Sequence, residues 1–88
     1  MVYINVVLEL ANDYSVNADV FKDSGNVIKE YSNLCSATAL LILALQSEEL
    51  SEDVRQELVS KCETFIKKQE TIETWLFSNT TTFIGFFK

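Results

Sequence analysis

Between positions 54 and 76, apolar residues recur every three or four positions, which is the spacing of one face of an α-helix. With a phase of about 100° per residue, Cys62 flanks a seam made of Val54, Leu58, Phe65, Ile72 and Leu76. A seam of this kind packs against neighbouring helices. Ser51 is a natural N-cap ahead of it, and acidic residues follow in the first turn, where the helix dipole favours them. The pattern therefore predicts a long helix from about Ser51 to about Leu76.

A second stripe lies about a quarter-turn from this seam. It consists of Val59 and Ile66, with Glu70 and Glu73 close by. A helix with a single partner surface has little reason to carry a second apolar stripe, so the stripe indicates a docking surface. Two plainer interpretations stand beside this one: the apolar pair belongs to the core, and the two glutamates are ordinary solvated charges.

The rest of the chain also favours helices. It has 88 residues, no proline and two glycines, so a single all-α domain is the expected class. The first helix is predicted over about residues 4–21; a strand over 2–8 is the alternative, because that segment is rich in β-branched residues. A break over 22–26 ends it, with Gly25 suited to a C-cap and Ser24 or Asn26 suited to the next N-cap.

The second helix is predicted over about residues 27–46 and is apolar on most sides. One seam contains Val27, Tyr31, Leu34, Thr38, Leu41 and Leu45, and a second contains Ile28, Cys35 and Ile42. A helix of this kind is buried by neighbours on both flanks. The expected fold is therefore an antiparallel three-helix bundle over residues 1–76, with this helix in the middle.

Residues 77–88 are predicted to be an aromatic C-terminal tail of unknown placement. The segment crowds together Phe77, Phe83, Ile84, Phe86 and Phe87. The three threonines at 80–82 weaken a helix there. Three interpretations are open: a strap folded back over the bundle, a surface for a partner or for self-association, and the cut end of a longer chain.

Charge and residue types exclude several function classes. The net charge is −6 and nucleic-acid binding needs a basic footprint, so no nucleic acid is expected and a basic protein segment is the better partner. There is no histidine, and Cys35 and Cys62 lack metal-ligand spacing; core thiols are expected, with a disulfide or redox role as the alternative. No metal, cofactor or catalytic activity is predicted, since no phosphate loop and no nucleophile beside a base is evident.

No membrane span is predicted from the sequence either. The longest apolar run, residues 39–45, is far shorter than the roughly 20 residues that a spanning helix needs. The N-terminus also lacks the basic region of a signal peptide.

Two blocks of the sequence have a family resemblance. The third helix contains Lys61-Cys62, Phe65-Ile66, Lys68, Glu70, Ile72 and Trp75-Leu76, and the break between the first two helices reads Lys22-Asp23-Ser24-Gly25-Asn26. Both blocks resemble the MIT (microtubule-interacting and trafficking) domain family, over about residues 22–76. The predicted first helix departs from the family pattern, because it lacks the usual lysine-rich amphipathic spacing, and the aromatic tail has no family counterpart.

The resemblance implies a non-catalytic docking module. MIT domains bind short C-terminal motifs of the filament-forming ESCRT-III proteins, either as an amphipathic helix between helices 2 and 3 or as an extended strip between helices 1 and 3. By family correspondence, Ile66 is the apolar contact of the first groove and Glu70 receives an arginine of the motif. Val59 would add a second apolar contact there, and Glu73 a second acceptor.

The opposite flank of the third helix holds Lys61, Lys68 and Trp75. The resemblance places that flank toward the groove between helices 1 and 3, where the lysines would meet an acidic strip. The plainer interpretations are surface lysines and a packing tryptophan, although tryptophan is enriched in binding hot spots. A module of this kind would be cytoplasmic and would recruit a parent protein to endosomal or other membranes through its partners.

A different class of protein fits the same sequence. Small phage-encoded inhibitors and bacteriocin-immunity proteins share this size, acidity and helicity. In that interpretation the chain is a stand-alone inhibitor whose acidic faces cover a basic partner or mimic a nucleic acid. A docking module should bind isolated peptides as a monomer, whereas a stand-alone inhibitor should oligomerise or bind one folded target tightly.

Overall fold

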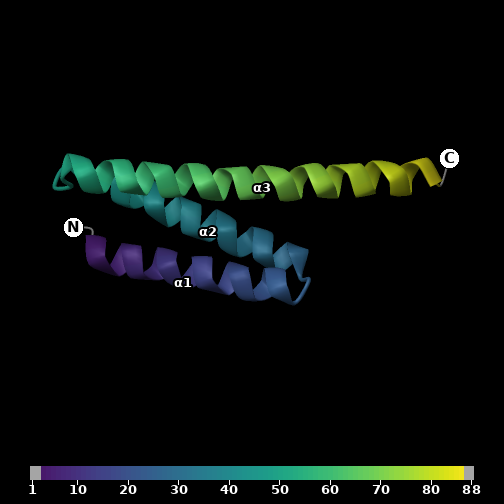
Figure 1. Ribbon diagram of the computed structural model, residues 1–88, viewed down its shortest axis with the longest axis horizontal. Coiled ribbons are helices and arrows are strands. Elements are labelled where there is room, and N and C mark those ends of the chain that lie inside the picture. The colour runs from purple at the N-terminus through teal and green to yellow at the C-terminus, as the bar shows by residue number, and fades with distance from the viewer. Residues whose placement is uncertain (1–2, 87–88) are drawn as a thin grey trace.

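Three helices make up the described part of the chain. The structure, a computed structural model, describes the backbone of residues 3–86 and the side chains of residues 3–79. Helix α1 is Ile4–Asp23, α2 is Val27–Leu45 and α3 is Glu52–Phe86. Successive helices run antiparallel, and α2 lies between the other two (Figure 1). The predicted antiparallel three-helix bundle is confirmed, and no strand occurs within residues 3–86.

Helix α1 forms over the segment for which a strand was the alternative. Val7, Ala11 and Ala18 are buried, and their spacing places them on one helical face toward α2. Packing of this face outweighs the strand preference of the β-branched residues around it. Two of the predicted signals end α1 and start α2: Gly25 has φ +77°, and the Asn26 side chain accepts a hydrogen bond of 3.1 Å from the backbone of Lys29.

The buried surface of α2 includes two alanines. Ala37 and Ala44 have no exposed surface. Ala44 shares a buried cluster with Val7 and Ala11 of α1, and small side chains at such a contact allow two helices to lie close together. Of the second seam predicted for this helix, Ile28 and Ile42 are instead 67% and 47% exposed. The helix is central, as predicted, but its buried surface is turned away from these isoleucines.

Helix α3 is fastened to α2 at the turn that joins them. The Ser51 hydroxyl accepts a hydrogen bond of 3.3 Å from the backbone of Val54, which confirms the predicted N-cap. The Arg55 guanidinium donates to the carbonyls of Leu45 at 2.6 Å and Ser47 at 2.8 Å. These carbonyls lie at the C-terminal end of α2, where a cation also complements the helix dipole.

A second attachment lies midway along the contact between α2 and α3. Thr38 is buried, and its hydroxyl donates to the Leu34 carbonyl at 2.8 Å while accepting from the Gln69 amide at 2.7 Å. The Gln69 oxygen in turn accepts from the Cys35 thiol at 3.4 Å. Polar groups at a helix interface have partners only in one register, so this network fixes how α3 slides along α2.

Helix α3 runs past its predicted end at Leu76 and continues to Phe86. Its last turns project beyond the α1–α2 hairpin along the long axis of the molecule, which measures 55 Å (Figure 1). The interpretation of residues 77–86 as a folded-back strap is therefore wrong. Three consecutive threonines lower helix propensity without breaking a helix, and no proline stops it. Phe87 and Lys88 of the predicted tail lie outside the described residues.

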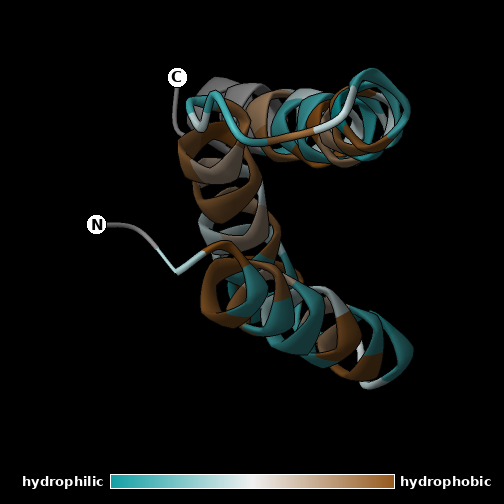
Figure 2. Ribbon diagram, turned by 90° about the vertical axis from the view of Figure 1, so that its left-hand side faces the viewer, coloured by the Kyte–Doolittle hydropathy of each residue, from teal (hydrophilic) through white to brown (hydrophobic). Residues whose placement is uncertain are grey.

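The bundle is open on one side. Both α1 and α3 lie directly against α2, but among the described residues no Cα atom of α1 comes within 8 Å of a Cα atom of α3. The two helices meet only through side chains that join the buried clusters on α2. Figure 2 shows α1 and α3 separated on either side of α2. By length and composition alone, α2 could also cross a membrane. In this fold the same apolar composition lets α2 serve as the helix on which both neighbours pack.

Candidate functional site

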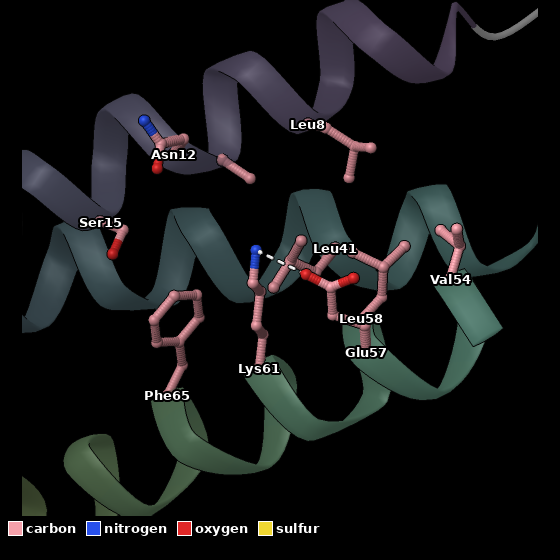
Figure 3. Close-up of a pocket in the computed structure, with 10 residues that line it drawn as sticks. Leu8, Asn12, Ser15, Leu41, Val54, Glu57, Leu58, Lys61 and Phe65 are labelled. Carbon is pink, nitrogen blue, oxygen red and sulfur yellow. Dashed lines mark ion pairs between the residues drawn. The ribbon is translucent and has the colours of Figure 1, made fainter.

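The open side of the bundle forms a groove between α1 and α3. The part of the groove near the start of α3 is a hollow of about 340 Å³. It is lined by Leu8, Ala11, Asn12, Ser15, Leu41, Val54, Glu57, Leu58, Lys61 and Phe65. Leu41 of α2 lies between the α1 and α3 residues (Figure 3). The apolar members come from all three helices, so the hollow depends on how α2 holds the other two.

An ion pair stands at the mouth of this hollow. The ammonium of Lys61 lies 3.7 Å from the Glu57 carboxylate, one helical turn away on α3. Lys61 extends from α3 toward α1 (Figure 3). Both side chains are more than half exposed, so the pair contributes little to stability and either charge is free to turn toward a ligand.

A second hollow, also of about 340 Å³, lies nearer the α1–α2 turn. It is lined by Lys22, Val27, Glu30, Lys68, Thr71, Ile72 and Trp75. Lys61, Lys68 and Trp75 follow one another at intervals of seven residues, which keeps them on the same flank of α3. Their predicted placement toward α1 agrees with these two hollows, and their binding role stays a prediction.

The other flank of α3 carries the second predicted stripe. Val59 and Ile66 are each 40% exposed, so neither belongs to the core. Glu70 is exposed as well. Glu73 is already engaged, because its carboxylate accepts a hydrogen bond from the Tyr31 hydroxyl of α2. This hydrogen bond raises the pKa of the Tyr31 phenol, and it leaves Glu70 as the more available acceptor of the two.

Five groove residues on α1 were not predicted: Leu8, Ala11, Asn12, Ser15 and Lys22. The apolar spacing of α1 is loose and does not distinguish the side that faces α2 from the side that borders the groove. The positions 8, 15 and 22 recur at seven-residue intervals and all line the two hollows. That repeat was the available signal, but a leucine, a serine and a lysine do not stand out as one surface.

The acidic residues and the two cysteines are the remaining candidates for a metal or redox site. Among the described residues no group of three or more His, Cys, Asp or Glu side chains could hold a metal ion. Cys35 and Cys62 are both free. Burial raises the pKa of the Cys62 thiol, which keeps this cysteine protonated and unreactive.

Comparisons of the chain with protein-family models, with curated proteins and with solved structures found no match.

Proposed function

We propose that this chain is a non-catalytic docking module that binds a short segment of a partner protein in the groove between α1 and α3. The observation behind the proposal is the open side of the bundle: the backbones of α1 and α3 both lie against α2 but stay more than 8 Å apart, Cα to Cα, and two hollows lie between them. The apolar floor offers anchoring contacts, and the lysines on its rim offer partners for acidic side chains.

The resemblance to MIT domains suggests which segments to test first. C-terminal motifs of ESCRT-III-type proteins are the proposed partners, and recruitment of a parent protein to membrane-remodelling sites is the proposed consequence. The stripe of Val59, Ile66 and Glu70 on the other flank of α3 is the second place where such a motif could bind. Because the two surfaces lie on opposite flanks of one helix, one pair of variants separates them.

The test is a titration of isotope-labelled protein with ESCRT-III C-terminal peptides, following amide chemical shifts. Val54 borders the α1–α3 groove and is 37% exposed, and Ile66 is 40% exposed on the other flank. Val54→Asp and Ile66→Asp therefore make the same chemical change at matched exposure. The proposal expects saturable shifts along the α1–α3 groove that Val54→Asp abolishes and Ile66→Asp leaves intact.

Other outcomes have definite meanings. Loss of binding in Ile66→Asp and in Glu70→Ala, with Val54→Asp unaffected, would move the site to the α2–α3 flank. An absence of shifts with every peptide, from a folded protein, would reject peptide docking and favour a stand-alone inhibitor of a folded target.

A further inference from the structure

The last part of α3, which starts beside the α1–α2 turn at Trp75 and Leu76 and then runs past it, differs in composition from the rest of the molecule. All 13 acidic residues lie at or before Glu73, and no charged residue follows until Lys88. The uncharged segment is rich in large apolar side chains, namely Trp75, Leu76, Phe77, Phe83, Ile84, Phe86 and Phe87. In this acidic protein, the last turns of α3 therefore contain no charged side chain that would favour contact with water.

The apolar surface at the start of this segment is not confined to one face. Trp75 is 52% exposed and Phe77 is 74% exposed. Two residues apart on a helix means about 200° apart around its axis, so the two rings lie on nearly opposite sides. A protein partner usually covers one stripe of a helix, whereas a helix that is apolar on several sides suits immersion in an apolar medium.

Acidic residues are also concentrated at one end of the long axis of the molecule. Four carboxylates, those of Glu48, Glu49, Glu52 and Asp53, cluster where α3 begins, at the end of the long axis opposite the projecting turns (Figure 1). A surface that receives the projecting end therefore meets an uncharged part of the helix, and the acidic cluster stays far away from it. Tryptophan favours the interface between water and lipid, and phenylalanine and leucine are common on the apolar side of helices that lie in that interface.

We propose that the C-terminal part of α3, from Trp75 onward, inserts into the interfacial region of a lipid bilayer. The rings supply the apolar contact, and attraction to anionic headgroups plays no part because the segment lacks basic residues before Lys88. The proposal does not rest on the docking groove. The two surfaces meet at Trp75, which also lines the second hollow of the groove, so the same molecule would contact membrane at one end and protein along its groove.

The chain contains its own reporter, since Trp75 is the only tryptophan. The experiment titrates the protein with unilamellar vesicles of phosphatidylcholine, with and without added phosphatidylserine, and follows tryptophan fluorescence and vesicle co-flotation. Insertion predicts a blue shift and co-flotation with phosphatidylcholine alone. Raising the salt concentration should leave both unchanged, and phosphatidylserine should not strengthen binding to an acidic protein.

Two variants make the test specific. Phe77→Asp removes an exposed ring and adds a charge, so it should lower the vesicle partition coefficient at least about tenfold. Val6→Asp is the control, because Val6 is an exposed apolar residue of α1 at the other end of the molecule, and it should bind like the parent. Circular dichroism checks that both variants keep their helices.

Three results would overturn the proposal. One is the absence of both blue shift and co-flotation. Another is binding that requires phosphatidylserine and disappears with salt, which would mean charge attraction. The third is a blue shift that grows with protein concentration without lipid, together with dimers in sedimentation, which would assign the projecting end of α3 to a second copy of the chain.

Discussion

The hydrogen-bond network at Thr38 should hold α3 in register on α2, and replacing this threonine with valine tests that role. Thr38→Val keeps the branched shape of a buried side chain and removes its hydroxyl. The hydroxyl makes two hydrogen bonds, one to the Leu34 carbonyl and one from the Gln69 amide. The Leu34 carbonyl also receives a longer bond of 3.4 Å from the same amide.

The expected size follows from what is left unpaired. A hydrogen bond contributes about 1 kcal/mol net, and a buried donor left without its partner costs about 1–3 kcal/mol. Gln69 is only partly buried and keeps its longer bond, which limits the loss. We therefore expect Thr38→Val to lower the free energy of unfolding by about 1–2 kcal/mol, which in a domain of this size lowers Tm by roughly 5–15 °C.

Urea denaturation followed by circular dichroism measures the change, and a double-mutant cycle assigns it to the network. Gln69→Leu alone leaves the Thr38 hydroxyl bonded to Leu34 and adds apolar contact, so its effect should be small. In the Gln69→Leu background, Thr38→Val should cost about 1 kcal/mol less than in the parent, because it then removes only the hydrogen bond to Leu34 and no amide remains to be stranded. An equal cost in both backgrounds would refute the network and leave the register to apolar packing alone.

Two further predictions concern the ends of the α2–α3 contact. Arg55→Lys keeps the charge but loses the fork that reaches the Leu45 and Ser47 carbonyls, so it should lower the free energy of unfolding by about 1–2 kcal/mol in urea denaturation; an unchanged midpoint would contradict the role of the fork. At the other end, the hydrogen bond to Glu73 raises the pKa of Tyr31 in the folded state above its unfolded value of about 10. The contribution of the Tyr31 hydrogen bond to stability is therefore complete below about pH 10 and is lost as the pH rises further. Between about pH 9 and pH 11 the free energy of unfolding should consequently fall less in Tyr31→Phe than in the parent, as measured by urea denaturation. Equal declines would mean that Tyr31 does not titrate differently on folding.

Local signals in the sequence predicted most of the helix boundaries. Asn26 and Ser51 cap α2 and α3 as their residue types suggest, and Gly25 adopts the positive φ expected after α1. Capping and glycine conformation depend on a few neighbouring residues, so a sequence is enough to find them. The end of α3 was missed because weak helix formers at 80–82 indicate low propensity without saying where a helix stops.

The candidate site was predicted only on α3. Periodicity separated its two flanks, and the structure places Lys61, Lys68 and Trp75 beside the hollows that border α1. Periodicity could not show that Glu73 accepts a hydrogen bond from Tyr31, because the two residues are 42 positions apart in sequence and meet only when α2 and α3 pack. It also did not identify the α1 side of the groove, where no strong periodicity marks a face.

The sequence by itself determined that this chain is helical, how many helices it forms within residues 3–86 and which side of α3 is apolar, since propensity, capping and periodicity act over a few residues. Only the tertiary structure decided that the bundle stays open between α1 and α3. That outcome depends on which face of α2 each neighbour contacts. Helix α1 packs where small residues such as Ala44 are buried, and α3 packs where Thr38 is hydrogen-bonded to Gln69. These contacts join residues that are far apart in the sequence, so the groove exists only when all three helices are packed together.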